Sequence, residues 1–270
     1  MKFEYTKERP LRVFTAFSGY DSQCMALDRI GIPYELVGWS EIDRYAIQAH
    51  NAVYPQWAGR NYGDISRIDW ESVPDFDLFT YSFPCTDVSN AGLQKGLSEG
   101  SGTRSSLLWE CRKAIAEKRP RYALMENVKN LVGKQNIGNF RRWEQWLAGL
   151  GYENFCKVLN ATDFNVPQHR ERVFMVSCLD NTNFRFPEKI RLERRLKDVL
   201  EPEVGEKYYL SAKRYEKILA HGDRKASEGC GFAPAFRGGQ DISTAVTTIQ
   251  DRGCNTYIVE DEQRQQTNMP

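Results

Sequence analysis

Short apolar runs alternate with amphipathic stretches along the first two thirds of the chain. Each run has the length and composition of a buried strand, and most are followed by a stretch with the spacing of a helix that has one apolar face. Runs and stretches pair as 11–17 with 22–30, 34–39 with 44–54, 77–82 with 105–118 and 122–125 with 139–150, and further runs follow at 155–160 and 173–178. This alternation predicts an α/β fold, with a doubly wound, Rossmann-like, mostly parallel sheet over residues 1–180.

The pattern changes after Cys178. Residues 181–270 bring prolines, a glycine-rich stretch at 229–239 and only brief strand-like pieces at 244–250 and 256–259. Such punctuation predicts a second, smaller α+β lobe of irregular structure over residues 181–270. We find no internal repeat and no low-complexity tract.

The composition is typical of a soluble globular protein, with 270 residues, 41% hydrophobic, 27% charged and a formal charge of +1. A charge so near zero gives no whole-protein signal for a polyanion, so a nucleic acid would be recognised by a local patch. The first ten residues have no apolar core, and no run approaches the roughly 18 apolar residues that cross a bilayer. We expect no membrane partner and a cytoplasmic location.

The seven cysteines are odd in number, scattered and never spaced as C-x-x-C, and only three histidines could add nitrogen ligands. This usage disfavours a disulfide framework and a zinc cluster, so we expect no metal.

A glycine turn, "FSGYDS" at residues 17–22, follows the first predicted strand. Gly19 would let the backbone approach a ligand beyond the carboxyl ends of the strands. Glu41, 22 residues on, has the spacing of a carboxylate that accepts ribose hydroxyls, and Asp64 could bond an adenine amino group. Because Asp21 puts a negative charge where a pyrophosphate would lie, the turn favours an uncharged or cationic adenosine ligand. The alternative is a loop glycine beside two solvated acids.

Cys85 stands in "SFPCTDVS", where an apolar run gives way to small polar residues. Pro84 forces the chain out of the strand and presents the cysteine at the carboxyl edge of the sheet. A polar loop that could flex over a substrate follows. The thiol is a small buried hydrophobe on one interpretation and a nucleophile, active as thiolate, on the other.

Two further segments end at the same predicted edge. Glu126 and Asn127 in "LMENVKN" are either capping residues or a desolvated acid with its neighbour. In "VPQHRERVF", Gln168, Arg170 and Arg172 alternate and so share one face of an extended segment, either as solvated charges or as a clamp for an anion or carbonyl.

In their order, "FSG", Glu41, "FPC", "ENV" and "QHRER" resemble the DNA (cytosine-5)-methyltransferase family over residues 11–178, with a looser echo at "TAVTTIQ", residues 244–250. The resemblance implies an S-adenosylmethionine-dependent methyltransferase fold, with residues 1–180 as cofactor-binding catalytic domain and 181–270 as target-recognition domain. It implies double-stranded DNA as partner, a bacterial or phage origin and a restriction–modification context.

The resemblance also implies site residues. Cys85 would add to cytosine carbon 6, and Glu126 would hydrogen-bond or protonate the ring at nitrogen 3 and the exocyclic amine. Arg172, with Arg170, would hold the base carbonyl or nearby phosphates. The flipped base would be enclosed by the loop after Cys85. The cofactor would contact Phe17, Ser18, Gly19, Tyr20, Asp21, Glu41, Ile42, Asp64, Ile65 and Pro84. The DNA would contact Ser89, Asn127, Gln168, Arg237, Gly238 and Gly239.

Residues 185–197 carry six cationic side chains against two glutamates, which is either a solvated face or a phosphate-binding patch. Three departures from the family stand out. Asp21 and Asn165 replace glycines, and both residue types tolerate left-handed backbone. The chain ends at "QQTNMP", where members continue into a segment that returns to the sheet, so a second polypeptide could supply it. RNA methylation and a catalytically silent DNA- or cofactor-binding module are the alternative functions.

Overall fold

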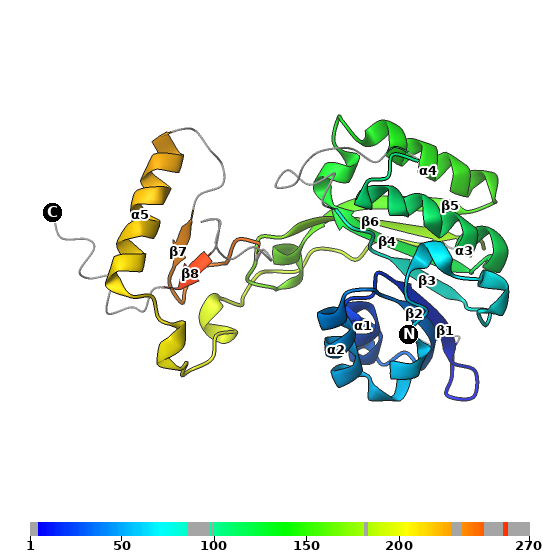
Figure 1. Cartoon of the computed structure of the whole chain (residues 1–270), viewed down its shortest axis with the longest axis horizontal. Helices are drawn as coiled ribbons and strands as arrows, with labels where there is room; N and C mark the ends of the chain where they lie inside the picture. The colour runs from blue at the N-terminus through cyan, green and yellow to red at the C-terminus, as the bar shows by residue number, and fades with distance from the viewer. Residues whose placement is uncertain are drawn as a thin grey trace. The chain divides into compact units, whose positions relative to one another are not determined.

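The computed structural model describes residues 5–85, 98, 100–180, 183–227, 234–245 and 256–258. The chain divides into two compact units (Figure 1). Unit 1 consists of Met1–Val158 and Arg172–Phe186, and unit 2 consists of Leu159–Glu171 and Pro187–Pro270. The segment 159–171, which the sequence places with the first domain, therefore packs with the later part of the chain. The roles assigned to the two predicted domains stay predictions.

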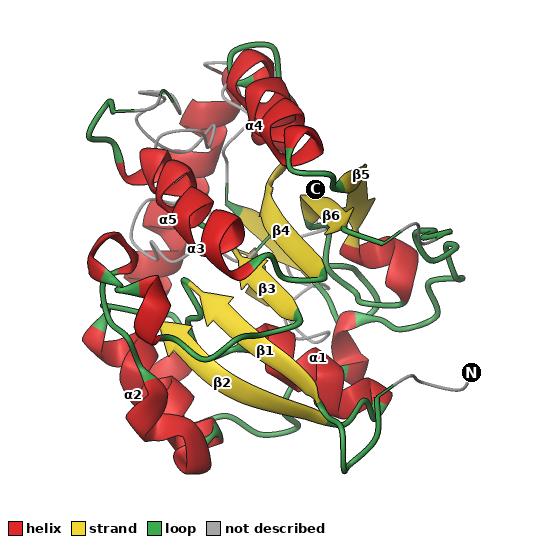
Figure 2. Cartoon of the chain, turned by 90° about the vertical axis from the view of Figure 1, so that its right-hand side faces the viewer, coloured by secondary structure: helices red, strands yellow, loops and turns green. Residues whose placement is uncertain are grey.

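Unit 1 is built on a six-stranded sheet with the order β2-β1-β3-β4-β6-β5 (Figure 2). The first four of these strands are parallel to their neighbours, and β6 is antiparallel to β4. The mostly parallel α/β sheet expected from the sequence is thus confirmed. The strands are β1 (Leu11–Ala16), β2 (Tyr34–Ser40), β3 (Leu78–Tyr81), β4 (Tyr122–Val128), β5 (Glu153–Asn160) and β6 (Glu171–Cys178).

Helices cover both faces of this sheet, because successive strand residues point to opposite sides. Val13 packs in a cluster with Cys24 and Leu27 of α1, whereas Phe14 packs in a larger cluster with Ile115 of α3 and Trp143 of α4. The helices are α1 (Ser22–Ile30), α2 (Arg44–Val53), α3 (Cys111–Lys118) and α4 (Ile137–Gly149). Because helices pack on both faces of the sheet, the ends of the strands are where polar side chains can reach a ligand.

Short 3-10 helices fill several connections that the apolar pattern did not resolve. The predicted helix at 105–118 is in fact a 3-10 segment followed by α3, which begins only at Cys111. The segments of unit 1 are η1 (Pro55–Arg60), η2 (Ile65–Arg67), η3 (Trp70–Ser72), η4 (Arg104–Glu110) and η5 (Lys129–Val132).

Unit 2 contains one longer helix, α5 (Ala212–Ser227), and a parallel pair of short strands, β7 (Ala235–Arg237) and β8 (Thr256–Ile258). The rings of Tyr215, Phe236 and Tyr257 follow one another at 5.4 Å between centroids and join helix to strands. Its 3-10 segments are η6 (Ala161–Phe164), η7 (Leu196–Asp198) and η8 (Glu206–Tyr208). Across the described residues, none of the helices has the length and apolar content that a membrane span needs.

Candidate active site

The order in which strands are added to the sheet reverses at β1, which lies between β2 and β3. The chain runs from β1 through α1 to β2 on one side, and later enters β3 on the other side. In open α/β sheets, ligands bind at the carboxyl ends of the strands where the order switches in this way. Several predicted site residues of unit 1 follow β1, β2 and β3 at these strand ends, and Glu126 and Asn127 lie within the last residues of β4.

The turn after β1 has left-handed backbone at three alternate residues, Phe17 (φ 56°), Gly19 (φ 58°) and Asp21 (φ 66°). Only glycine adopts this conformation without strain, so Gly19 suits the turn. The Gly19 N–H donates to Oε2 of Glu41 at 3.0 Å, so the two residues predicted to form the cofactor site are in direct contact.

Glu41 is oriented by backbone groups. Its Oε1 accepts from the N–H groups of Ile42 at 2.8 Å and Asp43 at 3.0 Å, in addition to the Gly19 bond. A carboxylate accepts about four hydrogen bonds, so Glu41 can still receive a ligand hydroxyl. Tyr20 and Ile42 are exposed beside it, at 52% and 70%.

Two other side chains, those of Ser18 and Asp64, also lie at this end of the sheet. Ser18 is 4% exposed, and its Oγ is buried with no hydrogen-bond partner among the described residues. Asp64 accepts from the backbone N–H and the hydroxyl of Ser66, and these bonds lower the pKa of its carboxyl. The Ser18 hydroxyl, without a partner in the described part of the chain, and the carboxyl groups of Glu41 and Asp64 fit a ligand that carries hydroxyl and amino groups, such as the adenosine of S-adenosylmethionine.

Two predicted cofactor residues are placed differently from what the sequence argument assumed. The side chain of Asp21 is 0% exposed and that of Ile65 is packed in the core at 3%. The charge of Asp21 therefore lies beneath the turn and does not face a ligand. The left-handed backbone directs the side chain of Asp21 inward, where it caps α1 by accepting from the Cys24 N–H.

Beyond β3, the chain that carries Cys85 is fixed from two sides. Asn127 Nδ2 donates to the Phe83 carbonyl at 3.0 Å, and Ser105 Oγ donates to the Pro84 carbonyl at 2.8 Å. The thiol of Cys85 is half-buried, while burial raises the pKa values of the Cys24 and Cys111 thiols. Cys85 is therefore partly exposed, and it lies shortly after the end of β3, where the preceding backbone is held by hydrogen bonds.

Glu126 and Arg172 are brought together by the antiparallel pairing of β4 and β6. Glu126 lies opposite Phe174, and Arg172 lies diagonally from it on the same face. The Arg172 Nε and Glu126 Oε1 atoms are 3.0 Å apart, and the side chains are 21% and 29% exposed. Partial burial makes this ion pair stronger than a surface pair, and the guanidinium fixes the direction of the carboxylate.

The remaining predicted residues belong to unit 2 or lie outside the described residues. The Arg170 carbonyl accepts from the Ala161 N–H, and the Arg170 N–H donates to Oδ1 of Asn160. Gln168 forms an isolated β-bridge with Ser243. Gly238 N–H donates to Asp241 at 2.8 Å, and the Gly239 carbonyl accepts from the Lys197 N–H. Arg237 ends β7. Ser89 and the predicted closing loop lie outside the described residues, as do residues 246–250 of "TAVTTIQ".

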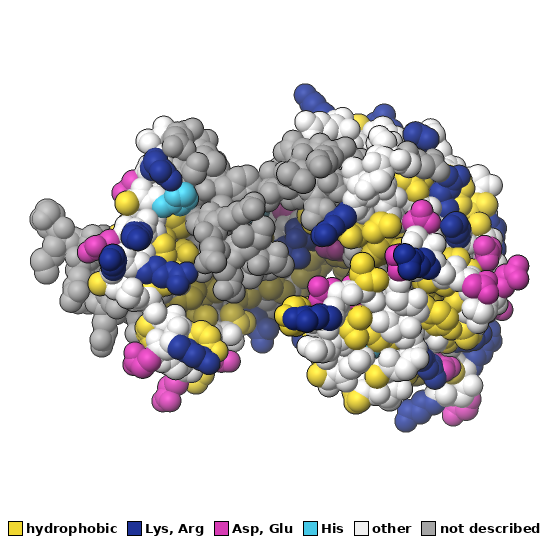
Figure 3. Space-filling model, viewed as in Figure 1, with side chains coloured by type: hydrophobic (Ala, Val, Ile, Leu, Met, Phe, Trp, Pro, Cys, Tyr) yellow, Lys and Arg dark blue, Asp and Glu magenta, His cyan; other side chains and the backbone are white. Residues whose placement is uncertain are grey.

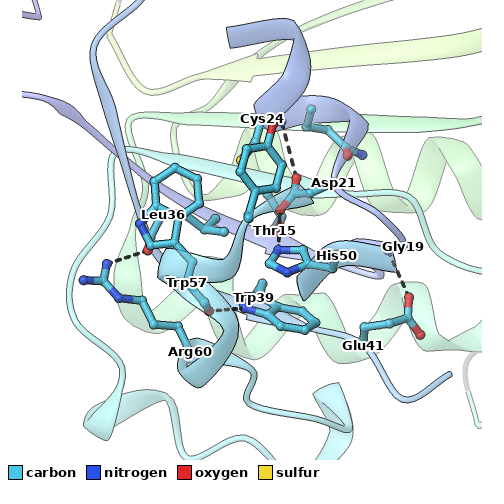
Figure 4. A network of polar contacts seen from close by, with 12 residues as sticks. Thr15, Gly19, Asp21, Cys24, Leu36, Trp39, Glu41, His50, Trp57 and Arg60 are labelled. Carbon is cyan, nitrogen blue, oxygen red and sulfur yellow. Dashed lines mark hydrogen bonds and ion pairs between the residues drawn. The ribbon is translucent and has the colours of Figure 1, made fainter. Parts of the chain in front are cut away.

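Sequence reasoning missed the residues that support the site from behind. Ser105 is one, and Figure 4 shows three others, Thr15, Trp39 and His50, which lie with Asp21 beneath the turn that carries Gly19. Their spacing in the sequence gives no sign of contact, because they come from β1, β2, α2 and the first turn. The described residues hold no cluster of three His, Cys, Asp or Glu side chains placed to bind a metal.

Comparison with known proteins identifies the family. The profile described as C-5 cytosine-specific DNA methylase matches residues 11–269. The chain belongs to this family. The type II methyltransferase M2.ScrFI of Lactococcus lactis subsp. cremoris is 42% identical over 252 residues, which cover 74% of this chain and 70% of that protein. The orphan methyltransferase M.SssI of Spiroplasma monobiae is 34% identical over 265 residues, covering 76% and 68%.

Other family members are longer. The orphan methyltransferase M.Rho11sI of Bacillus phage rho11s is 33% identical over 77% of this chain, and the chain spans about half of it, at 47%. Among solved structures, the S. pombe Dnmt2 methyltransferase matches with a TM-score of 0.71 and 20% identity over 96% of this chain and 81% of that one. The Entamoeba histolytica methyltransferase EhMeth matches with a TM-score of 0.73 and 18% identity over 91% and 73%. These two likenesses concern the fold.

Proposed function

We propose that this chain is a DNA cytosine-5 methyltransferase, or the major part of one, that modifies a flipped cytosine through a covalent Cys85 adduct. The observation that carries the proposal is the arrangement at one edge of unit 1. There Asn127 and Ser105 hold the backbone that leads to Cys85. Glu126, the neighbour of Asn127 in the chain, forms an ion pair with Arg172. The names of the relatives supply the substrate class.

The chain's own residues would activate the base. Carbon 5 of cytosine is a poor nucleophile. The Cys85 thiolate adds to carbon 6, forming a carbon–sulfur bond, while Glu126, oriented by Arg172, supplies a hydrogen bond or proton at ring nitrogen 3. Electron density then gathers at carbon 5. After that carbon has been methylated it loses its proton, and Cys85 leaves with the bonding electron pair.

S-Adenosylmethionine, when bound, supplies a methyl group on a positively charged sulfur. Glu41 would accept the ribose hydroxyls, Asp64 the adenine amino group, and Gly19 would let the backbone approach. Because the reacting ring atoms are covered by neighbouring bases in a duplex, the target base must leave the stack. Unit 2 would then contact DNA through Gln168, Arg170, Arg237, Gly238 and Gly239, and Ser89 would contact it from the loop after Cys85.

The test is covalent trapping. Random-sequence duplexes in which 5-fluorocytosine replaces cytosine are incubated with the chain and S-adenosylmethionine, then analysed under denaturing conditions. Fluorine at carbon 5 cannot leave as a proton does, so we expect a stable protein–DNA adduct that maps to Cys85 and disappears in Cys85→Ser. Cys156→Ser is the matched control, since desolvation by its neighbours and then the Glu144 carboxylate raise the pKa of that exposed thiol to about 11.

The outcomes separate the candidate functions. An adduct with fluorinated RNA and none with DNA would favour RNA as substrate. Binding of DNA or cofactor without any adduct would leave a silent binding module and contradict the proposed activity. An adduct that persists in Cys85→Ser would show that another nucleophile is used.

A further inference from the structure

His50 is a buried histidine that the proposed reaction does not use. It lies in α2, is 0% exposed, and its ring stacks on Trp39 of β2 with 3.8 Å between ring centroids and 20° between planes. Its Nε2 lies 3.5 Å from Oδ2 of Asp21, whose side chain is also 0% exposed. Neither Nδ1 nor Nε2 makes a hydrogen bond with ideal geometry among the described residues, so the 3.5 Å approach to Asp21 is the polar contact of the ring. The polar edge of the ring is thus aimed at Asp21 (Figure 4).

Asp21 in turn holds the turn between β1 and α1. Its Oδ2 accepts from the Thr15 hydroxyl at 2.8 Å, and its Oδ1 accepts from the Cys24 N–H at 3.3 Å. Its own N–H donates to the Ser18 carbonyl at 2.8 Å. A buried carboxylate is costly unless hydrogen bonds and an opposite or polar partner compensate it. Thr15, Cys24 and His50 together provide that compensation.

The turn fixed in this way meets the predicted cofactor site at Glu41. Two residues before Asp21, the Gly19 N–H donates to Glu41 Oε2. Ser18, between β1 and Gly19, donates its N–H to the Ser40 carbonyl at the end of β2. Contacts therefore run from α2 through His50 and Asp21 to the turn, and from the turn to the carboxylate that would accept ribose hydroxyls.

We propose that His50 and Asp21 form a buried positioning pair that holds the first turn, and through it Glu41, in the geometry that binds the adenosine of the cofactor. The proposal rests on the proposed function for the identity of the ligand. Without the polar ring nitrogen 3.5 Å from its Oδ2, the side chain of Asp21 is less compensated in the interior and turns towards water. The Gly19–Glu41 bond then loosens, because Asp21 and Gly19 share the same short turn.

The experiment compares three variants of the full chain. His50→Phe keeps an aromatic ring stacked on Trp39 and removes the polar nitrogens, whereas His50→Gln replaces the ring but offers a polar amide near the position of Nε2. Tyr54→Phe is the matched control, because it keeps the ring, whose centroid lies 5.7 Å from that of His50, and removes only the hydroxyl, which donates to Asp28 at 2.8 Å and ties the end of α2 to α1. The readouts are the dissociation constant for S-adenosylmethionine by calorimetry, hydrogen exchange of residues 17–24 in the ligand-free chain, and the thermal midpoint.

We expect His50→Phe to weaken cofactor binding about tenfold and to speed exchange of the Gly19 and Cys24 amides, because the buried Asp21 side chain loses its polar contact with the ring nitrogen. His50→Gln should stay within about threefold of the parent. Tyr54→Phe should lower the thermal midpoint while leaving binding and exchange in the turn unchanged. Unchanged binding and exchange in His50→Phe, an equal loss in Tyr54→Phe, or no recovery in His50→Gln would each overturn the positioning role.

Two further outcomes are decided by the same design. If His50→Phe does not fold, Asp21→Asn takes its place, since asparagine tolerates the left-handed backbone but weakens the pairing with His50. The same losses are expected for it, and their absence overturns the proposal. If the parent chain binds no S-adenosylmethionine, the proposed function fails on its cofactor. Hydrogen exchange of the amides in residues 17–24, measured without ligand, still decides whether His50 stabilises the turn.

Discussion

At the scale of single residues, the candidate site depends on how the backbone around Pro84 is held. Proline has no N–H, and the chain has already left the strand, so the strand ladder does not fix this segment. Asn127 and Ser105 bind the carbonyls of Phe83 and Pro84 instead. The thiol of Cys85 is therefore positioned by side chains from two other segments.

Replacing Ser105 tests this arrangement. We expect Ser105→Ala to slow adduct formation with 5-fluorocytosine DNA about tenfold, because one hydrogen bond that orients the nucleophile is lost. S-Adenosylmethionine binding should not change. Ser105→Thr keeps the hydroxyl and should recover most of the rate. The measurement is the single-turnover rate of trapping, together with the alkylation rate of Cys85.

Ser106→Ala is the matched control for this prediction. The Ser106 hydroxyl donates to the carbonyl of Thr103, the residue before the same 3-10 segment, at 2.7 Å, whereas the Ser105 hydroxyl donates to the carbonyl of Pro84. Each alanine variant loses a hydroxyl hydrogen bond to a carbonyl, worth about 1 kcal/mol of folding stability. If they slow trapping equally, Ser105 contributes to the stability of η4 and not to the position of Cys85.

At the scale of elements, the sequence predicted the sheet well and the side-chain directions poorly. The apolar run at 34–39 and the stretch at 22–30 correspond to β2 and α1 almost to the residue, because burial of one face dictates their periodicity. The antiparallel β6 could not be predicted, since a buried strand has the same pattern whichever way it runs. Asp21 was misplaced because its left-handed backbone turns the side chain inward, and the contact of His50 with Asp21 depends on the packing of α2 on the sheet.

One buried contact docks α4 on β3, the strand that leads to Cys85. Trp143 Nε1 donates to the Tyr81 hydroxyl at 3.0 Å, and both side chains are fully buried. Tyr81→Phe leaves the indole N–H without its acceptor, so we expect the free energy of unfolding to fall by about 1–3 kcal/mol in urea titrations. Tyr45→Phe, at a ring that is 63% exposed, should change stability by less than about 0.5 kcal/mol. Equal effects would mean that the bond to Trp143 contributes nothing.

At the scale of the whole molecule, charge is distributed without a dominant field. The formal charge is +1, and on the face drawn in Figure 3 the described Lys and Arg side chains are interspersed with Asp and Glu side chains. Affinity for DNA must then come from local groups, and the sequence points to residues 185–197. Within this segment Arg191 and Arg194 are exposed, while Lys189 Nζ lies 2.9 Å from the Asp163 carboxylate, so its charge is already compensated.

This difference allows one segment to supply both test and control. Each phosphate contact releases counterions, so losing one weakens binding similarly on all sequences and lowers the slope of log affinity against log salt by about 1. We expect the double variant Arg191→Ala/Arg194→Ala to reduce the slope by about 2, if both contact phosphates, and Lys189→Ala to leave it nearly unchanged. Calorimetric binding of S-adenosylmethionine, assigned to unit 1, should be the same in all three proteins. A slope that falls equally in Lys189→Ala, or not at all in the double variant, would show that the segment is a solvated face and that the DNA is held elsewhere.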